Sequence, residues 1–211
     1  MTTHNQIKAN TSYLIKLFLS FCLLFSFTTP SLAQKDSVNS SNYLLIINSY
    51  TEAAPWSFRM ISAITEYTQT LPQLALYTEH MNMLMMDADS TLKEFKQTIL
   101  EKYRQHSPRM LILIGNSSMI LRDDFRKMWG NVPIILCAEE DYIGPKEFYL
   151  QKKPIDVTAR IPIADIAKPY NLTFLHSNFY IKENIELICR MTPHIKNFIF
   201  IGDERQNNQT Y

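Results

Sequence analysis

The chain has 211 residues, 46% of them hydrophobic and 12% aromatic, which is enough to bury the core of one or two domains. Its 21 basic and 20 acidic side chains nearly balance, and this excludes a strongly basic surface for nucleic acid or an anionic membrane. The chain has four glycines, and neither GxGxxG nor GxxxxGK[ST] occurs, so no phosphate loop and no nucleotide chemistry is expected.

Residues 1–33 have the three parts of a secretory signal peptide. Lys8 and Lys16 precede an apolar stretch over 17–27, and a small-residue site of the A-x-A type ends at Ala33. The apolar stretch is shorter than the roughly 20 residues of a membrane-spanning helix, so cleavage after Ala33 is favoured over an uncleaved anchor. The two lysines are the only charges lost, which takes the net charge from +1 to −1.

The predicted export also bears on the three cysteines. Cys22 does not fit a lipoprotein site, because Phe21 stands where a small residue is needed. Cys137 falls in an apolar strand and Cys189 on a helix, so two buried thiols are favoured over a disulfide. No CxxC pair and no Cys/His cluster has metal-ligand spacing, and we expect neither a metal nor a cofactor.

After a polar leader over 34–42, short apolar runs alternate with amphipathic segments. The runs at 43–50, 74–80, 110–115 and 134–137 predict strands. The segments between them predict helices whose apolar stripes are Met60, Ile61, Ile64, Tyr67 and Leu71, then Leu92, Phe95, Ile99 and Tyr103, then Leu121, Phe125 and Met128. This alternation, with strands about 30 residues apart, predicts an α/β fold with a doubly wound parallel sheet.

Two finer features are expected along this part of the chain. Thr91 and Glu94 have the spacing of a capping box at the start of the second helix. The segment 141–169 contains four prolines and predicts an irregular connection with one short helix.

The last part of the chain predicts the end of one lobe and the start of another. A fifth strand at the sheet edge is predicted over 172–175, followed by a helix carrying Ile181, Ile185 and Ile188 and by a strand over 198–201. We expect a ligand-binding first lobe over 43–177 and the beginning of a truncated second lobe over 178–211.

Polar and aromatic residues gather where the predicted strands end, which is where parallel α/β sheets bind ligands. Tyr50 and Trp56 flank the end of the first strand and are suited to stack on a planar or sugar ligand. The alternative is packing of the first helix, which is favoured for Trp56 but not for Tyr50. Asn116 and Ser117 follow the third strand, where they either hold an anionic or hydroxylated ligand or cap a helix.

Acidic residues follow the fourth strand. Glu139, Glu140 and Asp141 favour a solvated acidic loop, with ligand contact from Glu139 as the alternative. They lack a neighbouring nucleophile or orienting His, so we expect no acid–base catalysis and no catalytic residues. The expected ligand-binding residues are Ser49, Tyr50, Trp56, Asn116, Ser117 and Glu139.

Four methionines beside His80 suggest either soft-metal binding or the filling of gaps in a core, and packing is favoured for Met81, Met83, Met85 and Met86. No Ser/His/Asp constellation can be named. The stretch from Gly115 to Ser118 lacks the second glycine of a GxSxG nucleophile elbow, so the chain is not expected to be an enzyme.

Five stretches between Tyr43 and Asp203 follow one another in an order shared with a known family. They are Asn48-Ser49-Tyr50 with Pro55-Trp56, Gly115-Asn116-Ser117, Val132-Pro133 through Glu139, Glu183-Asn184 with Pro193, and Gly202-Asp203. In this order they resemble the sensor domains of Bacteroidetes-type sensor histidine kinases and hybrid two-component regulators, which are similar to periplasmic substrate-binding proteins of type I.

The resemblance implies two α/β lobes hinged around a small ligand in the periplasm. The chain would then be the input domain of a membrane-bound two-component sensor kinase, acting in signal transduction. A stand-alone periplasmic solute-binding protein of an ABC-type transporter is the alternative. The implied partner is a small molecule and not nucleic acid. Membrane contact would come only through a downstream part of the parent chain. Whether the chain forms a homodimer is left open at this point.

Overall fold

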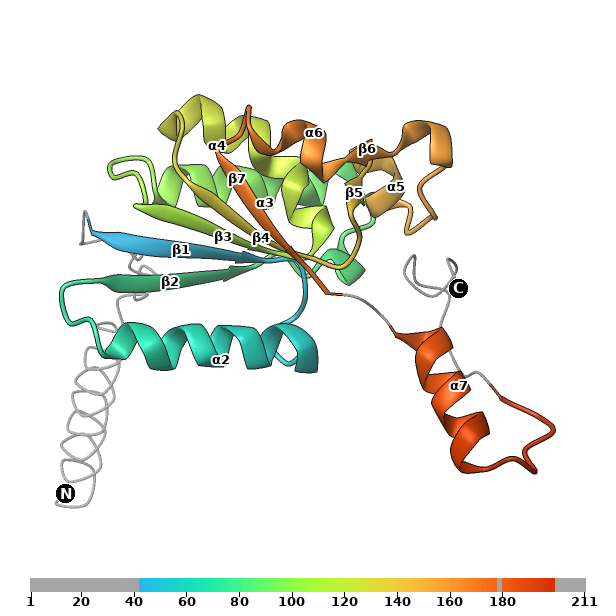
Figure 1. Cartoon of the computed structure of the whole chain (residues 1–211). Helices are drawn as coiled ribbons and strands as arrows, with labels where there is room; N and C mark the ends of the chain where they lie inside the picture. Colours follow the sequence, from blue (N-terminus) through green and yellow to red (C-terminus); the bar gives the residue numbers. More distant parts are fainter. Residues whose placement is uncertain (1–41, 178–179, 200–211) are drawn as a thin grey trace, which may run out of the picture. The chain divides into compact units, whose positions relative to one another are not determined.

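The structure, a computed structural model, describes residues 42–177 and 180–199 (Figure 1). The predicted signal peptide and nearly all of the leader lie outside the described residues. The described part contains a five-stranded sheet in the order β2-β1-β3-β4-β7, and all of its neighbouring strands are parallel. Its strands are β1 (Tyr43–Asn48), β2 (Ala75–His80), β3 (Met110–Ile114), β4 (Ile134–Ala138) and β7 (Leu172–His176). The predicted parallel α/β sheet and its fifth strand at the edge are confirmed.

Helices cover both faces of this sheet (Figure 1). On one face lies α2 (Pro55–Gln69), and on the other lie α3 (Asp89–Lys102) and α4 (Arg122–Trp129). The strand order explains this division. The chain leaves β1 toward β2 and then returns across the sheet through β3 and β4, and right-handed crossovers in opposite directions place their helices on opposite faces. The fold is therefore consistent with a doubly wound sheet.

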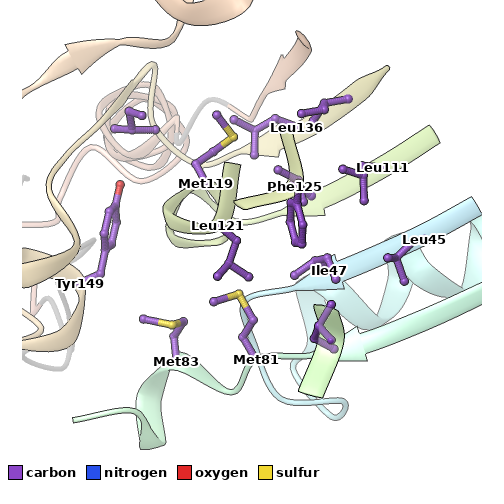
Figure 2. Packing of buried hydrophobic residues seen from close by; sticks show 14 of the residues in the cluster. Leu45, Ile47, Met81, Met83, Leu111, Met119, Leu121, Phe125, Leu136 and Tyr149 are labelled. Carbon is purple, nitrogen blue, oxygen red and sulfur yellow. The ribbon is translucent and has the colours of Figure 1, made fainter. Parts of the chain in front are cut away.

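The central strands β1, β3 and β4 are almost wholly apolar because both of their faces are buried, whereas the edge strands β2 and β7 contain polar residues and are less buried. Alternate residues of β1 and β3 face α3 and α4 in a large cluster that Figure 2 shows from close by, with Leu45, Ile47 and Leu111 among its members. The residues between them face α2 in a smaller cluster of Ile46, Ile112 and Ile114. Met81, Met83 and Met86 are also buried, as the packing interpretation predicts, whereas Met85 is 72% exposed.

Two details of the helices differ from the expectation. In α2 the residues that turn to the sheet include Ser57 and Thr68, with Ile61 and Ile64 between them, so Tyr67 falls beside the contact face and is 68% exposed. The capping box is wrong, because α3 begins at Asp89 and the Thr91 hydroxyl donates to the Ala88 carbonyl oxygen at 3.2 Å.

The connection from β4 to β7 is more ordered than expected. It contains β5 (Tyr142–Ile143), α5 (Lys146–Leu150), a 3-10 turn at Val157–Ala159, β6 (Ile161–Pro162) and α6 (Ile163–Ala167). Strands β5 and β6 pair antiparallel. Pro145 and Pro162 stand at the N-caps of α5 and α6, where a proline does not interrupt the helix because no intrahelical hydrogen bond needs its missing N–H.

Helix α7 (Ile181–Met191) confirms the predicted helix that follows the sheet. Cys189 on it is exposed and free, which corrects the expectation of two buried thiols, while Cys137 in β4 is buried and free as expected. Leu187 and Ile188 on the same helix are also exposed, so among the described residues no core covers this side of α7. Phe198 and Ile199 have no regular structure, and the rest of the strand predicted there lies outside the described residues.

No helix within 42–177 or 180–199 combines the length and the apolarity needed to cross a bilayer.

Candidate functional site

The candidate site lies at the carboxyl edge of the sheet, between β1 and β3. The chain leaves β1 toward β2 and leaves β3 toward β4, so the two exit loops part in opposite directions at this point. In open α/β sheets ligands bind where the connections diverge in this way. All six predicted ligand residues follow the carboxyl ends of β1, β3 and β4.

Gly115 fixes how closely the two exit loops approach. Its φ of +87° is a conformation that residues with a side chain rarely adopt. A Cβ atom there would stand 2.9 Å from both Cβ and Oγ of Ser49 and 3.0 Å from Cε2 of Tyr50. The absence of a side chain at this position therefore lets the β1 loop rest directly on the β3 loop.

Ser49 belongs to the scaffold of the site. It is 2% exposed, its N–H donates to the Ile114 carbonyl oxygen at 2.9 Å, and its hydroxyl donates to the Gly115 carbonyl oxygen at 3.3 Å. The Ser118 hydroxyl donates to the same Gly115 oxygen at 2.6 Å. Both hydroxyls are thus engaged inside the protein: that of Ser49 joins the β1 loop to the β3 loop, and that of Ser118 closes a turn within the β3 loop.

Asn48, the last residue of β1, holds the loop from the other side. Its side chain is fully buried, and its amide nitrogen lies 2.9 Å from Nδ1 of His80 and 3.3 Å from the Ser57 hydroxyl. Its amide oxygen accepts from the Tyr50 N–H at 3.2 Å. Asn48 thereby ties β1 to β2, to α2 and to its own exit loop.

Tyr50 and Trp56 form an aromatic pair at the mouth of the β1 loop. Their ring centroids are 5.6 Å apart with an interplanar angle of 80°, an edge-to-face contact. Both side chains pack against the smaller cluster of Ile46, Ile112 and Ile114, which supports the packing role expected for Trp56, and both stay partly exposed. The pair offers a ligand one fixed aromatic surface.

Asn116 acts as a clamp on the loop that follows β4. Its amide nitrogen donates to the carbonyl oxygens of Glu140 at 2.8 Å and Tyr142 at 2.7 Å, and its amide oxygen accepts from the N–H groups of Glu139 at 2.8 Å and Glu140 at 3.3 Å. At 5% exposure with four contacts, this side chain has its hydrogen-bonding capacity used by the protein itself. Ser117, the next residue, is partly exposed beside it.

The acidic loop is half-buried rather than fully solvated at two of its three positions. Glu139 and Glu140 are partly buried and Asp141 is exposed. Burial raises the pKa of Glu140, and Asp141 adds to this, whereas His176 and Arg160 act in the opposite direction. Nε2 of His176 lies 3.1 Å from the Glu139 carbonyl oxygen, so the end of β7 also reaches this loop.

Gly115 and Asn48 belong to the stretches that carry the family resemblance, but they are not among the expected ligand-binding residues, although both stand at the point where an apolar run ends. Such a position indicates where a strand ends, but it does not predict which residues far away in the sequence will contact it. Within 42–177 and 180–199, no three His, Cys, Asp or Glu side chains are grouped to hold a metal ion.

No family model matches this chain, and no match was found among curated proteins or solved structures.

Proposed function

We propose that this chain is the ligand-binding region of an extracytoplasmic sensor and that it binds a small solute at the carboxyl edge of its sheet. The observation that carries the proposal is the close packing of the β1 and β3 exit loops through Gly115. It leaves the Tyr50–Trp56 pair and Ser117 partly exposed at the position where doubly wound sheets take their ligands.

The chemistry of these groups favours a planar or hydroxylated solute. The aromatic pair supplies a face or edge for a ring, and the Ser117 hydroxyl supplies one donor and two acceptor positions. Glu139, whose N–H donates to the Asn116 amide oxygen, adds a carboxylate from the β4 loop. Ser49, Asn48 and Asn116 keep the loops in place, and this rigidity lowers the entropic cost of binding.

The expected signal is a change of conformation on binding. In a fold of the type I periplasmic-binding-protein kind, which the resemblance implies, a second lobe closes over the first. A ligand shifts that equilibrium by as much as its affinity for the closed form exceeds its affinity for the open one.

A sensor kinase input domain is the first candidate, and a solute-binding protein of a transporter is the second. The gene beyond the codon for Tyr211 separates them. A membrane span followed by a histidine-phosphotransfer helix and ATP-site glycines supports the sensor, and a stop after a second lobe supports the transporter component.

Export is part of the proposal. The n-, h- and c-regions of residues 1–33 support cleavage after Ala33 and a periplasmic location. N-terminal sequencing of the exported protein should begin at Gln34, and material that begins at Met1 would contradict the proposal.

Binding is tested by a thermal-shift screen of the purified chain against sugars and planar aromatic solutes. For a solute that raises the Tm, Tyr50→Ala should weaken binding about tenfold because one aromatic contact is lost. Tyr67→Ala is the matched control, since this tyrosine is 68% exposed on α2 and lies outside the candidate site. The proposal fails if both variants bind equally.

We expect binding without turnover. Ser117→Ala should cost at most about 1 kcal/mol of binding free energy, which is the contribution of one neutral hydrogen bond. If the purified chain hydrolysed an ester, a phosphate or a glycoside and Ser117→Ala abolished that activity, the chain would be an enzyme and this reading would be wrong.

A further inference from the structure

Strand β2 has an open edge. It is the outermost strand of the sheet, and among the described residues its only strand neighbour is β1 (Figure 1). The Ala75 N–H donates to the Asn42 carbonyl oxygen at 3.0 Å and the Met81 N–H donates to the Asn48 carbonyl oxygen at 2.7 Å. Successive residues of a strand point their backbone groups to alternate sides. Leu76, Thr78 and His80 therefore direct their N–H and C=O groups away from β1.

A groove lies along the same edge. It has a volume of about 410 Å³ and runs between β2 and the outer flank of α2. Thr78 and His80 line it, so these two residues supply both outward backbone groups and side chains to one surface. Apolar contact in the groove comes from Phe58, which is 55% exposed, and from Ile61.

The groove is acidic. Glu52 and Glu66 line it, both are exposed, and no Lys or Arg is among its lining residues. The sequence of β2, Ala-Leu-Tyr-Thr-Glu-His, also contains no Lys and no Pro, the residues that commonly protect an edge strand from pairing. Among the described residues, the edge therefore lacks these two protective residue types and carries negative charge beside it.

We propose that this edge binds an extended segment of a partner protein, which adds to the sheet as a further strand and places basic and apolar side chains in the groove. Strand addition gains affinity from main-chain hydrogen bonds and specificity from alternate side chains in neighbouring pockets. Here the backbone groups of Thr78 and His80 supply the main-chain hydrogen bonds. The side chains of Glu52, Glu66 and Phe58 supply the specificity. The groove includes Glu52 of the β1 exit loop and His80, whose Nδ1 lies 2.9 Å from the Asn48 amide nitrogen, so it adjoins the scaffold of the candidate solute site.

The test uses the whole chain and a labelled peptide, acetyl-Lys-Val-Lys-Val-Lys-Val-amide, in fluorescence anisotropy. We expect saturable binding that is at least tenfold tighter than that of the same peptide with Glu in place of Lys, because the groove is acidic. Methylation of alternate backbone nitrogens of the peptide should weaken binding at least tenfold, since it removes the donors that strand addition needs.

Two charge-reversal variants locate the contact. Glu66→Lys on the groove should weaken binding of the basic peptide about tenfold, and Glu94→Lys, on the exposed side of α3 across the sheet, should leave it within twofold. Both positions are exposed, so both variants should fold.

Four outcomes overturn the proposal. They are the absence of peptide binding, equal binding of the acidic peptide, no effect of backbone methylation, and no effect of Glu66→Lys. A dimer in sedimentation equilibrium that the basic peptide does not dissociate would also overturn it, because a second copy of the chain would then fill the edge.

Discussion

Gly115→Ala adds a single carbon atom, and it should strongly lower the stability of this protein. The new Cβ would stand 2.9 Å from the Cβ and Oγ atoms of Ser49 and 3.0 Å from Cε2 of Tyr50, and all three belong to residues held in place by other contacts. The backbone would also have to keep a φ of +87°. Backbone strain of this kind costs roughly 1–3 kcal/mol and overpacking a further 1–3 kcal/mol, so the expected loss is about 2–6 kcal/mol.

Gly130 provides the matched control. Its φ is +70°, but a Cβ added there would meet no atom within 4 Å. Gly130→Ala should therefore cost only the backbone strain, roughly 1–3 kcal/mol. The difference between the two variants measures the contact between the β1 and β3 loops.

The assay is urea unfolding of the wild type and both variants, followed by circular dichroism and fluorescence. A second substitution, Ser49→Gly, should recover part of the loss in Gly115→Ala because it removes the two closest atoms. If Gly115→Ala were no more destabilising than Gly130→Ala, the two loops would not be packed as described, and the site geometry would be wrong.

Two further predictions concern the loop after β4. Asn116→Ala should destabilise the chain by about 2–4 kcal/mol in urea unfolding, because it leaves four backbone groups of the loop without their partner. Asn131→Ala, on the exposed turn before β4, is the control and should cost less than about 0.5 kcal/mol. Equal losses in the two variants would refute the role of Asn116 as a clamp on this loop. Glu140→Gln should raise stability at neutral pH, since burial raises the pKa of this carboxyl above its ordinary 4.5 and the folded chain therefore holds the proton more tightly than the unfolded chain. The stabilisation that protonated Glu140 provides is complete below pH 4.5 and is lost as the pH rises through the raised pKa, so the variant should lose that part of the pH dependence. The same substitution at the exposed Glu147 is the control, and an unchanged pH profile in Glu140→Gln would refute the assignment.

The central sheet could be predicted because its signal is local. Each of the central strands β1, β3 and β4 is buried on both faces, so it appears as a nearly unbroken apolar run such as Leu111 to Ile114, whatever its neighbours are. The helices within 141–169 could not be predicted in the same way, because their starts have no distinctive local signal. A proline at a helix start and a proline in a loop look alike in the sequence, and only the position of Pro145 and Pro162 at N-caps decides between them.

The location of the candidate site could be predicted from the sequence, but the hydrogen bonds and contacts of its residues could not. Polar residues after strands had to meet at the carboxyl edge once the sheet was parallel. The Asn116 amide donates to the Glu140 carbonyl oxygen, 24 residues away in the sequence. This contact depends on a loop conformation that no local pattern encodes. Likewise, the contact of Ser49 with Gly115 spans 66 residues and requires a positive φ that the sequence alone shows only as one of four glycines.

The central claim is that a small solute binds between β1 and β3, and the two tryptophans of the chain allow a direct test. Trp56 belongs to the aromatic pair of the candidate site, whereas Trp129 lies at the end of α4, where its Nε1 donates to the Tyr103 carbonyl oxygen at 3.3 Å. In a ¹⁵N-labelled chain titrated with a solute from the thermal-shift screen, the indole N–H signal of Trp56 should move with saturation while that of Trp129 stays in place. A solute that binds to saturation and leaves the Trp56 signal unchanged would contradict the account.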